Sequence, residues 1–177
     1  MTVTPALESS NRERAYDDVA HQTARKAATM STTILATIVT PDQATAFAGN
    51  ITTLRAEQTG GSISLVDFTL AADGHGPAPH YHETFDEIYH VISGTLTVTI
   101  GTEQHEAPTG SSIFIPRGVV HTFQNHGDVP ARFLFLMSPG GFERAFDDLA
   151  AVQARDGEIT PAAFAEVIAQ YDVRIAT

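Results

Sequence analysis

Four side chains of this 177-residue chain have the types and the spacing to share one metal ion. His80 and His82 are two residues apart, and alternate residues of a strand point to the same face, so both imidazoles can reach one ion at about 2.0–2.1 Å. Glu87 adds a carboxylate and His121 a third imidazole. A divalent first-row ion suits this donor set, and its preference for five or six ligands leaves positions open for a substrate, which favours catalysis over a structural site.

Two turns must bring these side chains together. Glu87 follows His82 by five residues, an odd offset that would place it on the opposite face of a continuous strand. A bend through residues 83–86 removes this conflict, because a second strand can then begin with Glu87 facing the same interior. The turn residues Pro116-Arg117-Gly118 lie just before His121 and bring it in from elsewhere in the chain.

The surrounding sequence predicts an all-β fold. From residue 32 to about residue 138, short apolar or alternating stretches recur between glycine-containing turns, and the first of them is a strand expected at Ile34–Val39. This spacing is typical of a sandwich or barrel and lacks the helical intervals that a parallel α/β fold needs.

A helical period replaces the alternation after Pro139-Gly140-Gly141. Apolar residues recur there at steps of three and four, which predicts an amphipathic helix, and Thr160-Pro161 is a typical start for a second one. We expect residues 1–29 to form an N-terminal arm that is helical or disordered, residues 30–140 a barrel, and residues 141–177 a helical extension packed on the barrel.

The two residue clusters resemble the motifs of the cupin superfamily. Residues 74–94 match the pattern G-x5-H-x-H-x4-E-x6-G, and residues 110–125 match G-x5-P-x-G-x2-H-x3-N, at every defined position. The resemblance implies a double-stranded β-helix, or jelly-roll barrel, with His80, His82, Glu87 and His121 as ligands of one divalent transition-metal ion. Nickel, manganese, iron, cobalt and zinc all fit this donor set. A barrel whose site holds no metal is the alternative.

Within the cupins, the chain resembles single-domain bacterial quercetin 2,3-dioxygenases. The resemblance rests on Thr59-Gly60-Gly61 and on the segments at residues 76–80 and 139–143. It implies a metal-dependent dioxygenase that acts on a flavonol-like or other aromatic enol with O2, and it implies that Glu87 is the general base.

The expected pocket is apolar. Tyr89 shares strand parity with Glu87, and Phe123 shares it with His121, so we expect both aromatic side chains to contact the substrate. Arg117 is the one basic residue between Arg55 and Arg132, which disfavours sugar phosphates and other anions. Two alternatives to the dioxygenase are a metal-dependent, non-oxidative isomerase or cyclase of an aromatic or polyketide metabolite, and a non-catalytic small-molecule-binding cupin.

Composition narrows the class of protein further. The net charge of −11 argues against nucleic acid and anionic membranes as partners, and the lack of cysteine excludes disulfides and thiolate metal sites. The N-terminal sequence does not resemble a signal peptide, and no apolar run reaches the length of a membrane span, so we expect a cytoplasmic protein. A homodimer is expected for this fold class, with the outward residues Ile88 and Ile92 as candidate contacts.

Overall fold

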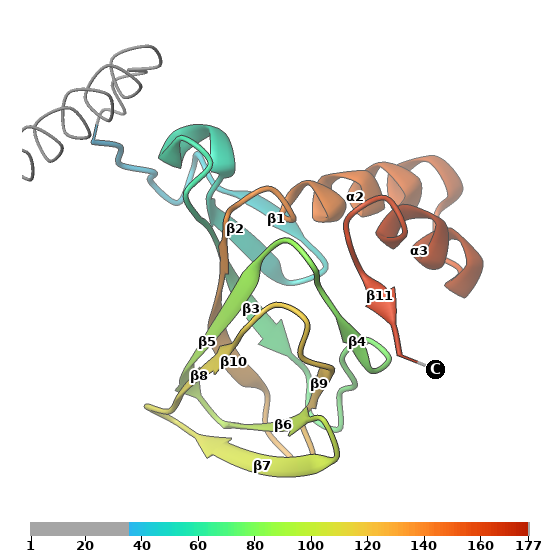
Figure 1. Ribbon diagram of the computed structural model, residues 1–177. Helices are drawn as coiled ribbons and strands as arrows, with labels where there is room; N and C mark the ends of the chain where they lie inside the picture. Colours follow the sequence, from blue (N-terminus) through green and yellow to red (C-terminus); the bar gives the residue numbers. More distant parts are fainter. Residues whose placement is uncertain (1–35, 177) are drawn as a thin grey trace, which may run out of the picture. The chain divides into compact units, whose positions relative to one another are not determined.

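Residues that alternate between buried and more exposed positions form the strands of a two-sheet barrel, seen for residues 36–176 in a computed structural model (Figure 1). β10 (Ala131–Ser138) shows the period most clearly. Its residues Phe133, Phe135 and Met137 are buried, whereas the residues between them are partly exposed.

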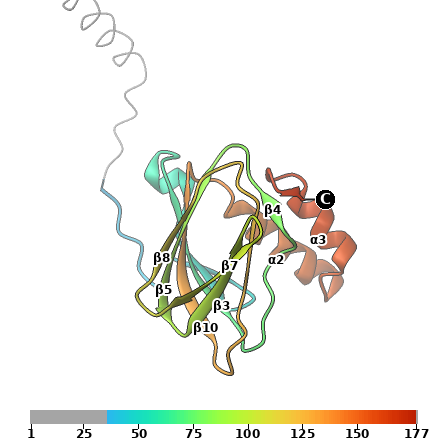
Figure 2. The same ribbon diagram turned by 60° about the horizontal axis from the view of Figure 1, so that its bottom comes forward.

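The strands form two antiparallel sheets. The first has the order β1-β2-β3-β10-β5-β8, and the second has the order β11-β4-β9-β6-β7. The remaining strands of the first sheet are β1 (Thr45–Phe47), β2 (Asn50–Leu54), β3 (Ser64–Leu70), β5 (Asp86–Ser93) and β8 (Ser112–Ile115). Those of the second sheet are β4 (His80–Tyr81), β6 (Thr95–Ile100), β7 (Glu103–Pro108), β9 (His121–Gln124) and β11 (Arg174–Ile175). Neighbouring strands are mostly distant in sequence, as a jelly-roll barrel requires, and Figure 2 shows the two sheets facing each other.

Aromatic side chains fill the space between the sheets. The ring of Tyr89 packs edge-on against those of Phe123, Phe133 and Phe135, with ring centroids 5.4–5.6 Å apart. The ring of Phe68 stacks on that of Phe133 at 5.1 Å. These separations are those of favourable aromatic pairs, so the barrel has a packed core and is not an open channel.

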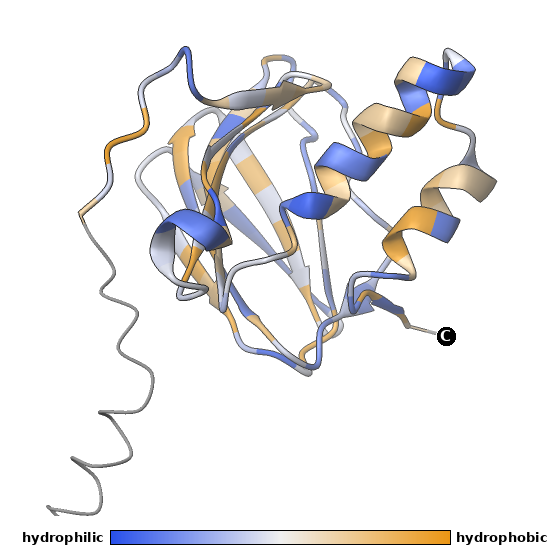
Figure 3. Ribbon diagram, turned by 90° about the horizontal axis from the view of Figure 1, so that it is seen from above, coloured by the Kyte–Doolittle hydropathy of each residue, from blue (hydrophilic) through white to orange (hydrophobic). Residues whose placement is uncertain are grey.

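Two helices lie outside the barrel, on the side that carries β4 and β11 (Figures 1 and 2). They are α2 (Arg144–Asp156) and α3 (Pro161–Ile168), and a short 3-10 helix η1 (Ala56–Thr59) follows β2. Thr160 caps α3, because its hydroxyl accepts a hydrogen bond from the Ala163 amide. Figure 3 shows hydrophobic residues recurring along both helices, and Leu149, Val152 and Val167 form their common apolar contact.

The all-β fold with helices after the barrel confirms the expected fold class. The strand expected at Ile34–Val39 is wrong in its described part, because residues 36–39 have no regular structure. The expected N-terminal arm, residues 1–29, lies outside the described residues. Within residues 36–176, no helix combines the length and the apolar character that crossing a membrane requires.

We expect Phe133→Ala to lower the free energy of unfolding by about 3–5 kcal/mol, because the side chain is fully buried and its removal leaves a cavity among the rings. Phe164→Ala is the matched control, since Phe164 on α3 is 39% exposed. Its cost should stay below about 1 kcal/mol. Urea denaturation measures both, and equal losses would contradict a core centred on Phe133.

Candidate metal centre

Strand pairing and two turns bring the four predicted ligands together. His80 on β4 is the direct cross-strand partner of His121 on β9. The chain bends after His82, as predicted, and Glu87 is the second residue of β5. Gly118, with a positive φ of 81°, donates its amide hydrogen to the carbonyl of His82 at 2.6 Å, so the turn before His121 also holds the end of β4.

The four side chains converge inside the barrel. Each is no more than 5% exposed, and one potential ligand atom from each lies within 4.8 Å of the others. Nε2 of His82 lies 3.0 Å from Oε1 of Glu87, and Nε2 of His121 lies 3.0 Å from Oε2. Two atoms that bind one ion from opposite sides, each about 2.1 Å from the ion, are about 4 Å apart. The four ligand atoms here lie within 4.8 Å of one another, so small movements suffice to coordinate an ion.

Hydrogen bonds orient all three imidazoles. Nδ1 of each ring faces a backbone carbonyl: that of Ala78 for His80 at 3.0 Å, and that of Val119 for His121 at 3.0 Å. For His82 the carbonyl belongs to Asp172, at 2.9 Å. A hydrogen on Nδ1 that donates to a carbonyl leaves the Nε2 lone pair free, which is the usual arrangement of a histidine that binds a metal.

The donor atoms fit a divalent cation. Nε2 of His82 is buried and has no hydrogen-bond partner among the described residues, although Oε1 of Glu87 is only 3.0 Å away. An imidazole lone pair and a carboxylate oxygen at this distance repel each other unless a positive charge lies between them. The fit therefore rests on an unpaired buried nitrogen, on converging lone pairs and on a buried carboxylate.

The pKa values show how the protein behaves before an ion binds. Burial, together with the charges of His121 and His82, lowers the pKa of His80 to about 4, so this ring is neutral at physiological pH. Burial is the largest single influence on the pKa values of Glu87 and His121 and acts against charge on both, but the hydrogen bonds and charges of their neighbours together outweigh it. The pKa of Glu87 is therefore lowered and that of His121 raised, and below this raised pKa a proton on His121 takes the place of the cation.

Tyr89 extends the site beneath Glu87. Its hydroxyl donates a hydrogen bond to Oε2 of Glu87, and burial raises its pKa well above 10, so it remains a donor. Tyr89 and Phe123 both face the interior, as their strand parity predicts, and both are buried in the aromatic core. Their contact with a substrate stays a prediction.

Side chains of opposite parity face away from the centre. Asp86, next to Glu87, accepts hydrogen bonds from the backbone amide and the guanidinium of Arg117. His90 is exposed and lies beside the hydroxyl of Ser112. All six arginines within residues 36–176 form ion pairs with carboxylates, so none of them is left as a free cation for an anionic substrate.

Two aromatic rings separate the centre from the surface. The ring of Phe85 stacks on that of His82 with centroids 4.0 Å apart, and the ring of Phe142 lies 5.9 Å from it. Both also line a pocket of about 220 Å³, whose other lining residues are Thr84, Pro139, Gly140, Gly141, Gln170, Tyr171 and Asp172. This pocket therefore adjoins one proposed ligand, His82, through the rings of Phe85 and Phe142.

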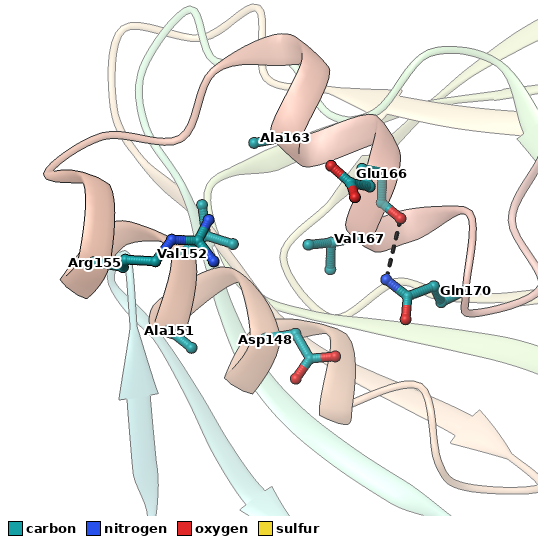
Figure 4. Close-up of a pocket in the computed structure, with 8 residues that line it drawn as sticks. All are labelled: Asp148, Ala151, Val152, Arg155, Ala163, Glu166, Val167 and Gln170. Atoms are coloured by element: carbon teal, nitrogen blue, oxygen red, sulfur yellow. Dashed lines mark hydrogen bonds between the residues drawn. The ribbon is translucent and has the colours of Figure 1, made fainter.

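A second pocket, of about 280 Å³, lies between α2 and α3 (Figure 4). It is larger, but it is lined by helix residues such as Asp148, Arg155 and Glu166, and by neither of the two rings that pack against His82. We therefore assign access to the centre to the smaller pocket.

Three contacts of the centre were not among the sequence predictions: Phe85, Phe142 and Asp172. Phe142 was predicted only as part of an amphipathic helix, and Phe85 lies in the bend. Asp172 precedes β11, and a two-residue strand has no periodicity that could reveal it.

Comparison with known proteins agrees with this geometry. Residues 66–137 match the cupin domain family. SchB of Streptomyces halstedii is 32% identical to the chain over 92 residues, which are 51% of this chain and 67% of SchB. The chain belongs to the cupin superfamily. The second sequence relative, the tetracenomycin polyketide synthase protein TcmJ of Streptomyces glaucescens, is 30% identical over 86 residues.

The two sequence matches cover only part of this chain and of each relative. The segment shared with TcmJ is 49% of this chain and 58% of TcmJ. Among solved structures, KdgF from Halomonas sp. superposes with a TM-score of 0.52 at 16% identity and covers 62% of this chain and 99% of KdgF. That likeness concerns the cupin fold alone.

We expect the affinity for Ni²⁺ to rise with pH, by up to about tenfold per pH unit, until the pH passes the raised pKa of His121, because the ion must displace that proton. The folding stability of the metal-free chain has the opposite pH dependence. The Glu87–His121 interaction stabilises the folded chain most below the ordinary pKa of histidine, and this stabilisation is lost as the pH rises through the raised pKa of His121.

Chelator-competition titrations between about pH 6 and pH 9 measure this dependence. His90→Gln is the control and should leave the profile unchanged, since His90 is exposed and faces outward. An affinity that does not change with pH would contradict the protonated Glu87–His121 pair.

Proposed function

We propose that this cupin is a metal-dependent enzyme that isomerises or cyclises an aromatic or polyketide metabolite without consuming O2. The observation that carries the proposal is the buried cluster of His80, His82, Glu87 and His121, next to a pocket walled by aromatic rings. The names of two relatives support the substrate class: TcmJ, and the polyketide synthase CurC of Streptomyces cyaneus, which is 30% identical over 92 residues.

The four side chains would bind one divalent transition-metal ion: nickel, manganese, iron, cobalt or zinc. When bound, such an ion supplies Lewis-acid polarisation of a substrate carbonyl oxygen. His80, His82 and His121 supply neutral nitrogen donors, and their carbonyl partners fix which nitrogen faces the ion.

Glu87 is the proposed general base. Its carboxylate would take a proton from the carbon next to the polarised carbonyl, and that carbon would then bond to a second carbonyl carbon of the same substrate. Glu87 would return the proton to the new alkoxide oxygen. Tyr89 donates a hydrogen bond to Oε2 and so holds the carboxylate in place throughout. One C–H bond and the π bond of the attacked carbonyl break, one C–C bond and one O–H bond form, and no oxidant is needed.

The surroundings favour an uncharged aromatic substrate. Phe85 and Phe142 line the route from the pocket to His82, and Tyr89 and Phe123 would contact the reacting end from below. The arginines nearest in sequence to the site are paired with carboxylates on the outside, so an anionic group would find no partner there.

The dioxygenase expected from the sequence requires the same centre and the same base. It differs in consuming O2 and in acting on a flavonol, whereas the names of the relatives point to polyketide chemistry. A non-catalytic small-molecule-binding cupin would bind the ligand and leave it unchanged.

One probe for each chemistry separates these three proposals. The chain, loaded in turn with each metal, is incubated in D2O with 2-hydroxyacetophenone, whose phenol and ketone can chelate an ion, and deuterium entry into the methyl group is followed by NMR. Quercetin is tested in parallel with an oxygen electrode and a carbon monoxide assay. Deuteration without O2 uptake supports the proposal. O2 uptake with carbon monoxide release would support the dioxygenase, and binding of either probe without reaction would favour the binding protein.

We expect Glu87→Gln to lower the deuteration rate by about 10²–10⁴-fold, because the amide cannot accept the proton. Asp86→Asn is the matched control, since the neighbouring carboxylate faces outward to Arg117, and it should keep nearly the full rate. Full activity of Glu87→Gln with metal bound would exclude Glu87 as the base.

A homodimer is proposed through the outer face of the first sheet. Leu65, Leu136, Ile88 and Phe114 are successive cross-strand partners on β3, β10, β5 and β8, so they form an apolar row across four strands. Phe114 is 61% exposed and Ile88 37% exposed. A second copy with the same row would cover these side chains by two-fold symmetry.

Phe114→Glu should convert the dimer to a monomer, because pairing the faces would bury two uncompensated carboxylates. Val129→Glu is the control, since Val129 is also exposed, at 55%, but lies outside the strands. Light scattering after gel filtration gives the mass of each. A dimer that survives Phe114→Glu would rule out this face.

A further inference from the structure

A short segment after α3 returns to the metal ligands. This return segment, residues 171–176, contains β11, which pairs with β4 so that Ile175 is the cross-strand partner of His80. The amide of Ala176 donates to the carbonyl of Pro79 at 2.9 Å. The two-residue strand that carries His80 therefore has a neighbour on each side, β9 with His121 and β11 from the return segment.

Within the return segment, Asp172 contacts the centre directly. Its backbone carbonyl accepts the hydrogen bond from Nδ1 of His82 at 2.9 Å. Its carboxylate Oδ2 accepts bonds from the backbone amides of Glu83 and Thr84, at 2.9 and 2.8 Å, and from the Thr84 hydroxyl at 2.6 Å. One residue thus orients a proposed ligand and also ties down the bend between His82 and Glu87.

The backbone of Asp172 has the conformation that this contact needs. Its φ is 54°, in the left-handed region, where aspartate and asparagine are tolerated better than other residues with a side chain. On one side, Tyr171 anchors the segment, because its hydroxyl donates to the carboxylate of Asp148 on α2. On the other side, Arg174 lies within ion-pair distance of Glu83.

His82 differs from the other two histidines in where its partner comes from. The carbonyls that orient His80 and His121 belong to residues two positions earlier, so they form together with the local turn. The carbonyl that orients His82 is 90 residues away in sequence. The orientation of this one ring therefore depends on whether the return segment is docked.

We propose that Asp172 is a positioning residue for the metal centre and that docking of the return segment and binding of the metal favour each other. This inference rests on the metal centre proposed above. By linkage, the factor by which the docked segment raises metal affinity equals the factor by which the metal favours docking. Loss of an outer hydrogen-bond partner of a metal ligand typically costs about 10–100-fold in affinity.

Three substitutions separate the roles of Asp172. All three keep the backbone carbonyl that faces His82, so they change only how firmly Asp172 is held. Asp172→Ala removes the carboxylate that accepts from Glu83 and Thr84, and places a Cβ-bearing residue without a polar side chain at positive φ. Asp172→Gly removes the carboxylate but suits the backbone, and Asp172→Asn keeps one side-chain oxygen and tolerates this φ. Asp156→Ala is the control, because Asp156 is exposed and, among residues 36–176, pairs only with its neighbour Arg155.

The test measures the Kd for Co²⁺ by chelator competition and the visible spectrum of the bound ion. We expect Asp172→Ala to weaken binding by about 10–100-fold with an altered spectrum, Asp172→Gly by less, Asp172→Asn least, and Asp156→Ala not at all. In the unaltered chain, hydrogen–deuterium exchange of the return segment should slow when Co²⁺ or Ni²⁺ binds, more than exchange in β6 and β7.

The outcomes are distinct. Failure of the unaltered chain to bind any of the metals would overturn both the metal centre and this inference. Normal binding with an unchanged Kd and spectrum in Asp172→Ala, and with exchange of the return segment unaffected by metal, would overturn this inference alone. The exchange experiment needs no variant, so a substitution that prevents folding does not block the test.

Discussion

One electrostatic constraint governs the site: three imidazole nitrogens and a carboxylate meet in the buried interior of a barrel. Such a group of lone pairs is unfavourable in a medium of low dielectric constant unless a positive charge is shared among them. In the metal-free chain, below the raised pKa of His121, a proton on this ring, which is hydrogen-bonded to Glu87, supplies this charge. A divalent ion would supply more of it and would also satisfy the unpaired nitrogen of His82.

The barrel serves this constraint by fixing each ligand from a different direction. Pairing of His80 with His121 brings two rings into register, and the bend after His82 turns the chain so that Glu87 faces the same point. The aromatic core lies behind Tyr89, and the pocket lined by Phe85 and Phe142 lies on the side of His82. Rigid strands and a carboxylate bonded to Tyr89 hold a general base where little reorganisation is needed.

Much of this arrangement could be predicted from sequence, because it depends on short-range rules. Strand parity placed His80 with His82 and Tyr89 with Glu87, and glycine and proline marked the turns. The same rules could not find Asp172, whose contact with His82 spans 90 residues and depends on a strand of two residues. They also predicted a strand at Ile34–Val39 that residues 36–39 do not form, since β-propensity without a pairing partner does not fix a strand. Strand parity could not distinguish an oxygen-dependent from an oxygen-independent reaction either, because both would use the same four metal ligands.

Anomalous X-ray diffraction tests the metal centre most directly. Crystals of the chain loaded with Co²⁺ would be measured on both sides of the cobalt absorption edge. We expect one strong anomalous peak, bounded by the Nε2 atoms of His80, His82 and His121 and by the carboxylate of Glu87. A peak elsewhere, or no peak among these four side chains at saturating Co²⁺, would contradict the proposed metal centre.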